Sequence, residues 1–257
     1  MPTVRSHSSR VISKGNGDRH ADVEAVLGEL QRLSSKKVRA EMETRYGIIT
    51  DKAYGVMMRD MQQVAKSIGT DHEFAQALWD TGWYEARMVA CMVADPAQVT
   101  VVEMDAWCKD FDNWGICDTV CFKLWDRVPH AMGRVAKWAK SEDEFVMRAA
   151  YALLACLALH NKDIDRKVFL AQLPLIERAA KDDRNFVKKG VSWALRGIGG
   201  RDPECREAAL ELAHSLATSE HPAQRWVGKD VLRDLSRPLA MRRAAGNKST
   251  RKLLPKG

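Results

Sequence analysis

One acidic residue occupies a position that is basic elsewhere in the chain. Four copies of a short pattern place a basic residue three positions after an aromatic one, and these basic residues are Arg87, Arg148, Lys189 and Lys229. A fifth copy, at residues 115–120, carries Asp118 instead, and the five positions then lie 31, 30, 41 and 40 residues apart. Cations at regular intervals suit a phosphate backbone, which a carboxylate among them repels. A residue that weakens binding in this way suggests a catalytic role.

Two tryptophans share the spacing of these positions. Trp114 lies four residues before Asp118, and Trp193 lies four residues after Lys189. Residues four apart share one face of a helix, and an indole ring is the strongest aromatic partner for a cation. Two indoles beside one carboxylate predict a site for a flat, positively charged group. The spacing equally allows a plainer interpretation, in which Asp118 pairs with a neighbouring arginine or caps a helix after Asn113.

The elements that must position these residues are helices. Apolar residues recur at helical spacing almost throughout residues 21–236, whereas alternating β-branched runs are scarce. Proline pairs that suit helix starts separate the periodic stretches, at Asp95-Pro96, Val128-Pro129, Leu173-Pro174, Asp202-Pro203 and His221-Pro222. Intervals of 30 to 41 residues are the lengths of helix-pair repeats. The sequence therefore predicts an all-α, HEAT- or armadillo-like solenoid whose second helices line one concave, DNA-binding face.

The net charge of +7 is concentrated at the two ends of the chain. Residues 1–20 carry a net charge of +3 and residues 237–257 carry +7, which leaves the rest of the chain at −3. We expect residues 1–20 to form a flexible basic tail, residues 21–236 to form one repeat domain, and residues 237–257 to form a disordered basic tail. Evidence for a nucleic-acid partner must then come from where charges lie on the body.

Several classes of protein are disfavoured by the sequence. It has no apolar run of membrane-spanning length and no signal-peptide pattern, so a cytoplasmic location is expected. Cys117 and Cys121 lack a second ligand pair at metal-binding spacing, and Walker, dinucleotide-binding and His-Glu-x-x-His motifs are missing, so we expect no metal and no cofactor. The six cysteines and four tryptophans on apolar stripes are predicted core residues, the latter being Trp79, Trp107, Trp125 and Trp138.

Three segments carry a resemblance to a known family. Residues 112–118 read DNWGICD, residues 145–150 read FVMRAA, and residues 185–196 read NFVKKGVSWALR. Together they resemble the bacterial DNA alkylation repair family of HEAT-like alkylpurine DNA glycosylases, the AlkD type. Arg45-Tyr46 followed by Tyr54-Gly55-Val56 is similar to the first block of that family, so the resemblance spans residues 40–235. The stretch Gly115-Ile116-Cys117 departs from the family in lacking polar side chains.

The resemblance implies an enzyme of base excision repair. Its substrate would be double-stranded DNA with purines alkylated at N3 or N7. The enzyme would act as a monomer without a cofactor, in the cytoplasm and associated with the nucleoid. By motif position Asp118 would be the catalytic carboxylate, and Trp114, Trp193 and Tyr46 would contact the lesion. The resemblance and the basic pattern together predict the contacts to the DNA backbone, which are Arg148, Arg87, Lys188, Lys189, Arg196 and Lys229.

Two alternatives belong to other functional classes. A non-catalytic DNA-binding or scaffold solenoid would keep the basic residues and would not need Asp118. A peptide-binding adaptor of the armadillo kind would carry an asparagine or acidic ladder, whereas the ladder here is basic. Replacing Asp118 by asparagine separates an enzyme from a binder, because only an enzyme loses turnover.

Overall fold

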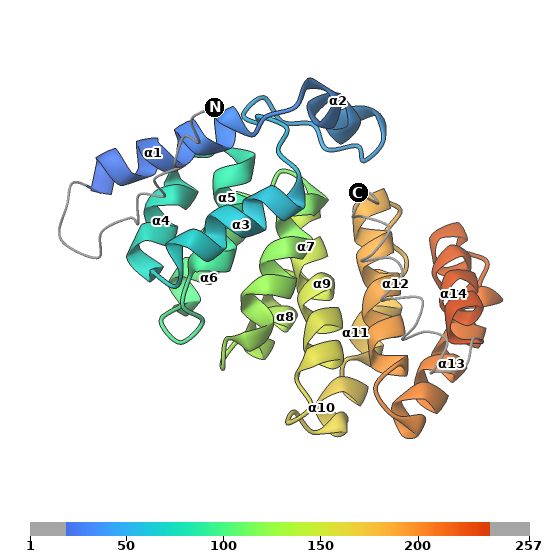
Figure 1. Ribbon diagram of the computed structural model, residues 1–257. Coiled ribbons are helices and arrows are strands. Elements are labelled where there is room, and N and C mark those ends of the chain that lie inside the picture. Colours follow the sequence, from blue (N-terminus) through green and yellow to red (C-terminus); the bar gives the residue numbers. More distant parts are fainter. Residues whose placement is uncertain (1–18, 237–257) are drawn as a thin grey trace, which may run out of the picture. The chain divides into compact units, whose positions relative to one another are not determined.

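The computed structural model describes residues 19–236, within which every regular element is a helix (Figure 1). The all-α prediction is confirmed. Contacts divide the chain into two compact units, one holding α1 to α5 and the other holding α6 to α14 together with residues 48–50. The boundary at Asp95-Pro96 is one of the predicted helix breaks. That residues 21–236 act as one repeat domain stays a prediction. Both predicted tails lie almost entirely outside the described residues.

The first unit contains a buried carboxylate, that of Glu85, which binds backbone N–H groups. Its helices are α1 (Arg19–Arg32), α2 (Lys36–Thr44), α3 (Met58–Ile68), α4 (His72–Asp80) and α5 (Tyr84–Val93). Glu85 on α5 is fully buried and accepts hydrogen bonds from the backbone N–H groups of Tyr54, Gly55 and Val56. The Tyr54 ring stacks on Trp83 with 4.0 Å between ring centroids. These contacts fix the segment between α2 and α3 against the start of α5.

The second unit is a set of stacked helix pairs. It contains α6 (Val101–Lys109), α7 (Trp114–Lys123), the short η1 (Trp125–Arg127), α8 (Met132–Trp138), α9 (Glu144–His160), α10 (Arg166–Leu170), α11 (Leu173–Ala179), α12 (Asn185–Gly199), α13 (Pro203–Ala217) and α14 (Pro222–Leu235). Helices α7, α9, α12 and α14 pack on one another in that order, and we call them the anchor layer (Figure 1). Helices α8, α11 and α13 pack against α9, α12 and α14 respectively. The predicted repeat spacing therefore corresponds to real helix pairs.

Helix α9 lies at the centre of this unit. Every residue from 148 to 158 is buried, as expected for a helix that is apolar on all sides and packs against neighbours all round. Gly197 of α12 lies against α9 so closely that a Cβ there would be 3.1 Å from the Ala155 carbonyl oxygen. The missing side chain lets the two helices approach, which brings the side chain of Arg148 next to the backbone of α12.

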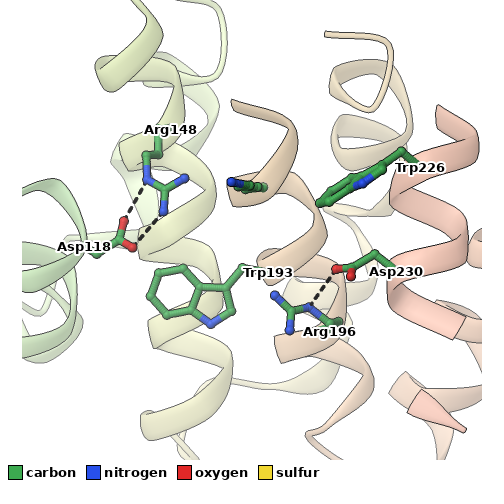
Figure 2. A pocket seen from close by; sticks show the side chains of 7 residues that line it. Asp118, Arg148, Trp193, Arg196, Trp226 and Asp230 are labelled. Carbon is green, nitrogen blue, oxygen red and sulfur yellow. Dashed lines mark hydrogen bonds and ion pairs between the residues drawn. The ribbon is translucent and has the colours of Figure 1, made fainter. Parts of the chain in front are cut away.

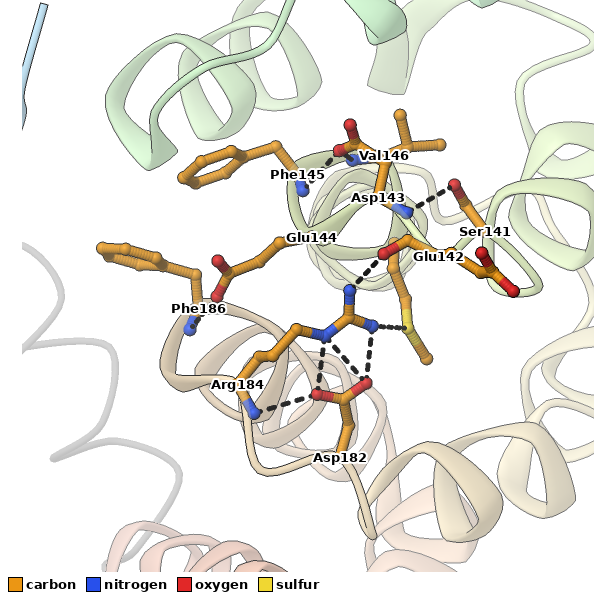
Figure 3. Close-up of polar contacts among 10 residues, drawn as sticks. Ser141, Glu142, Asp143, Glu144, Phe145, Val146, Asp182, Arg184 and Phe186 are labelled. Carbon is orange, nitrogen blue, oxygen red and sulfur yellow. Dashed lines mark hydrogen bonds and ion pairs between the residues drawn. The ribbon is translucent and has the colours of Figure 1, made fainter.

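The N-terminal ends of α9 and α12 are tied together by polar contacts (Figure 3). Asp143 caps α9 by accepting hydrogen bonds from the backbone N–H groups of Phe145 and Val146. The Arg184 guanidinium, just before α12, pairs with Asp182 and donates to the Glu142 carbonyl. In addition, the Phe186 N–H donates to the Glu144 carboxylate at 3.1 Å. These bonds fix the relative register of the two helices that carry Arg148 and Trp193.

Residue types account for several local features of the structure. Asn113 caps α7, and its side chain accepts a hydrogen bond from the Ile116 N–H. Pro203 and Pro222 are the first residues of α13 and α14. The four predicted core tryptophans are buried, and so are all six cysteines. In residues 19–236 no helix is long and apolar enough to cross a membrane.

Candidate active site

The anchor layer carries a hollow of about 460 Å³ (Figure 2). All four of its helices contribute to the lining: Asp118 from α7, Arg148 from α9, Lys189, Trp193 and Arg196 from α12, and Trp226 and Asp230 from α14. Five of these seven residues are ones that the sequence had singled out. The hollow thus combines two carboxylates, two indoles and three cations within one unit of the protein.

Asp118 is held by a two-pronged ion pair with Arg148. The Arg148 Nε donates to Asp118 Oδ1 at 2.9 Å, and its Nη2 donates to Oδ2 at 2.7 Å (Figure 2). The remaining terminal nitrogen, Nη1, donates to the Phe186 carbonyl oxygen at 2.6 Å. The Arg148 side chain is only 7% exposed, whereas Asp118 remains 20% exposed. Each carboxylate oxygen can accept more than one hydrogen bond, so Asp118 can still meet water or a ligand.

Burial and ion pairing act in opposite directions on Asp118. Burial raises the pKa of its carboxyl, and the charge and hydrogen bonds of Arg148 limit that rise. For Arg148, burial acts to lower the pKa, but the Asp118 carboxylate outweighs it and raises that pKa above its usual value. The guanidinium therefore stays charged, and it stabilises a carboxylate that burial alone would tend to protonate.

Of the two tryptophans predicted to contact the lesion, one lines the hollow and the other does not. Trp193 lines the hollow with Asp118, and Figure 2 shows its indole below the Arg148–Asp118 pair. Trp114 is the first residue of α7, one turn before Asp118, and is half-buried outside the lining of the hollow. A spacing of four residues places Trp114 and Asp118 on the same face of a helix, but it does not determine which turn of that helix lines a hollow.

The predicted basic stripe is divided between exposed and buried positions. Lys189 and Lys229 are exposed, and Lys189 lines the hollow together with Arg196. Arg148 is buried in its pair with Asp118, so its predicted contact with the DNA backbone stays a prediction. The plainer interpretation of Asp118, in which it pairs with a neighbouring arginine, describes its contacts in the structure. The carboxylate also remains partly exposed beside that pair.

Two lining residues on α14 were not singled out from the sequence. Trp226 is 37% exposed, and the Lys188 Nζ lies 5.2 Å from the centroid of its ring. Asp230 accepts a hydrogen bond from the Ser192 hydroxyl at 2.6 Å and pairs with Arg233 and, at 3.7 Å, with Arg196. Trp226 is the aromatic member of the same repeated pattern that contains Lys229, which is the signal that could have identified it.

Two further predicted residues belong to the first unit. The Arg87 guanidinium lies 5.0 Å from the centroid of the Trp79 ring, and its Nε donates to the Trp79 carbonyl at 3.4 Å. Tyr46 is half-buried with the Arg45 guanidinium 5.4 Å from its ring centroid. Their roles toward DNA stay predictions. Across residues 19–236 no cluster of three or more His, Cys, Asp or Glu side chains could hold a metal ion.

Comparison with known proteins identifies the family. A family model described as DNA alkylation repair enzyme matches residues 26–238. The chain belongs to the DNA alkylation repair enzyme family. No curated protein sequence matches it significantly.

The chain is also similar to solved structures. One belongs to a family of proteins related to the HEAT-like repeat DNA glycosylases, with affinity for branched DNA structures; it is 20% identical with a TM-score of 0.68, and the match covers 82% of this chain and 94% of that one. A designed armadillo repeat protein is 13% identical with a TM-score of 0.42, covering 86% of this chain and 96% of that one. The first match confirms the predicted HEAT-like fold.

Proposed function

We propose that this family member is a DNA glycosylase of base excision repair that hydrolyses the N-glycosidic bond of purines alkylated at N3 or N7. The observation that carries the proposal is the Asp118 carboxylate, which is ionically paired yet partly exposed in a hollow with Trp193. Membership of a family of DNA alkylation repair enzymes supports the same reaction class.

The chemistry needs only one carboxylate because the substrate is already activated. Alkylation at N3 or N7 makes the purine cationic, so the bond from C1′ to the base breaks with its electron pair moving to the purine, which leaves neutral. The sugar becomes positively charged, and the Asp118 carboxylate stabilises that charge. Water then bonds to C1′, and its proton passes to the carboxylate or to solvent. No second carboxylate is required as a general acid, unlike in sugar hydrolases.

Aromatic side chains would contact the lesion, and cationic side chains would contact the DNA backbone. We propose that Trp193, with Trp114 and Tyr46, favours the cationic nucleotide through the electron-rich faces of the rings. Lys189 and Arg196 at the hollow are the first candidates for phosphate contacts. The others carried over from the sequence are Arg87, Arg148, Lys188 and Lys229. We further propose that the protein acts as a monomer on nucleoid DNA in the cytoplasm.

The decisive comparison is between the wild-type protein and Asp118→Asn. DNA treated with a methylating agent is incubated with each, released bases are separated by chromatography, and binding to the same DNA is measured by fluorescence anisotropy. We expect release of N3- or N7-methylpurine by the wild type, loss of release by at least about a hundredfold in Asp118→Asn, and binding by both. The matched control Asp183→Asn, at an exposed position before α12, should release bases normally.

A second candidate function is supported by the pairing of Asp118 with Arg148. A carboxylate held in a two-pronged ion pair can also serve only to join α7 to α9, as in a non-catalytic DNA-binding or scaffold protein. The solved relative with affinity for branched DNA structures suggests which DNA such a protein would hold. Absence of base release by the wild type, together with tight binding by both proteins, would favour this second function.

A further inference from the structure

Trp226 exposes a large apolar ring within the hollow. It is 37% exposed, and it lines the same hollow as Asp118 and Trp193. An exposed indole that lines a hollow together with carboxylates and cations offers a flat apolar face to a ligand. The other indole of the hollow, Trp193, is better covered, being half-buried.

The equivalent rings of the repeated pattern pack on each other, whereas Trp226 meets a cation. Phe145, Phe186 and Trp226 occupy equivalent positions on α9, α12 and α14. The rings of Phe145 and Phe186 pack on each other with 5.3 Å between centroids, and both are half-buried (Figure 3). On α14 the ring is larger and more exposed, and Lys188 supplies a cation 5.2 Å from its centroid. This contact orients the indole.

The charges around Trp226 favour an anionic ligand. Lys188 lies over the ring, and Lys189 and Arg196 line the hollow beside it. The nearby Asp230 would repel an anion, but its carboxylate is taken up by Ser192, Arg233 and Arg196. An aromatic surface among cations is the combination that binds single-stranded nucleic acid, in which bases stack on rings and phosphates meet cations.

We propose that Trp226 stacks on an unpaired or displaced nucleobase of the bound DNA. An indole can stack only on a base whose face is exposed, and bases inside an intact duplex have both faces covered by neighbours. Trp226 would thus recognise a local opening of the helix at the hollow, whereas Asp118 acts on the sugar. The inference rests on the proposed function only in taking this hollow as the place where DNA binds.

The test compares two unmodified DNA duplexes that differ by one unpaired adenine. Binding is measured by fluorescence anisotropy at several salt concentrations for wild type, Trp226→Ala, Trp226→Phe and Phe122→Ala. Phe122 on α7 is the matched control, because it is an aromatic residue of nearly equal exposure, 38%, that does not line the hollow. The variant Trp226→Phe keeps an aromatic face and guards against a general effect of truncation.

We expect Trp226→Ala to bind the duplex with the unpaired base about tenfold more weakly and the fully paired duplex within about twofold of wild type. Trp226→Phe should keep most of the affinity, and Phe122→Ala all of it. Stacking releases no counterions, so the salt dependence of Trp226→Ala should equal that of wild type. Unchanged binding by Trp226→Ala, or an equal loss on both duplexes, would overturn the proposal.

This experiment is independent of catalysis. The DNA carries no alkylated base and no base release is measured, so a protein without glycosylase activity can still show the predicted difference. Conversely, base release that depends on Asp118 combined with unchanged binding by Trp226→Ala would leave the proposed function standing and remove this inference.

Discussion

At the scale of single residues, the site is defined by how Arg148 holds Asp118. All three nitrogens of the buried Arg148 guanidinium donate hydrogen bonds, two to the Asp118 carboxylate and one to the Phe186 carbonyl, and these bonds fix the orientation of the carboxylate. Breaking such a pair leaves an uncompensated charge, which is costly in a site of low dielectric. Arg148 is therefore best described as a positioning residue: it orients Asp118 and favours its ionised form, and the exposed edge of Asp118 faces the hollow.

This role predicts a pH effect. In the proposed mechanism Asp118 acts as a carboxylate, so base release should rise with pH through its pKa, which burial raises and Arg148 restrains. Arg148→Met removes the restraining charge, so the acid limb of the rate profile should move to higher pH, while Arg148→Lys should move it less. The measurement is single-turnover release against pH, corrected for spontaneous loss of bases. A lower plateau with an unmoved acid limb would mean that Arg148 acts only through structure.

At the scale of elements, close helix packing builds the hollow. Gly228 lies two residues after Trp226 on α14, and a Cβ there would be 2.3 Å from the Ala217 backbone nitrogen and 2.6 Å from the Ala213 carbonyl oxygen. Both atoms belong to the backbone of α13, so they cannot rotate away as a flexible side chain could. The absence of a side chain at Gly228 therefore sets how near α14 lies to α13.

Two glycine substitutions should consequently have opposite effects on stability. Gly228→Ala should lower the free energy of unfolding by about 2 kcal/mol, because α14 must move away from α13. Gly133→Ala on α8, where a Cβ would meet nothing within 4 Å, should raise it by about 0.5 kcal/mol through better helix propensity. Denaturant unfolding followed by circular dichroism gives both values. Equal effects of the two substitutions would contradict this account of the packing.

The element scale also shows where sequence reasoning succeeds. The intervals between Asp118, Arg148, Lys189 and Lys229 predicted the order of the anchor layer, because a repeat unit is one helix pair. The pairing of Arg148 with Asp118 and the lining by Trp226 and Asp230 depend on how near α7, α9, α12 and α14 approach one another. Spacing along a chain does not determine that distance.

At the scale of the whole molecule, the proposed DNA binding would depend on where the cations lie rather than on the total charge. Residues 21–236 carry a net charge of −3, yet Lys189 and Arg196 line the hollow on α12. Membership of the DNA alkylation repair enzyme family agrees with the proposed action on DNA. Contacts within the chain divide it at the Asp95-Pro96 break into two compact units, a division that helical periodicity does not report.

The central claim is that the Asp118 hollow excises purines because alkylation has made them cationic. The most direct measurement is single-turnover base release from two duplexes of identical sequence, one with N7-methylguanine and one with the neutral lesion hypoxanthine, by wild type and Asp118→Asn. We predict release of N7-methylguanine by wild type, loss of that release in Asp118→Asn, and no release of hypoxanthine above the enzyme-free rate. Equal release of N7-methylguanine by both proteins, or equal release of both lesions by wild type, would contradict the claim.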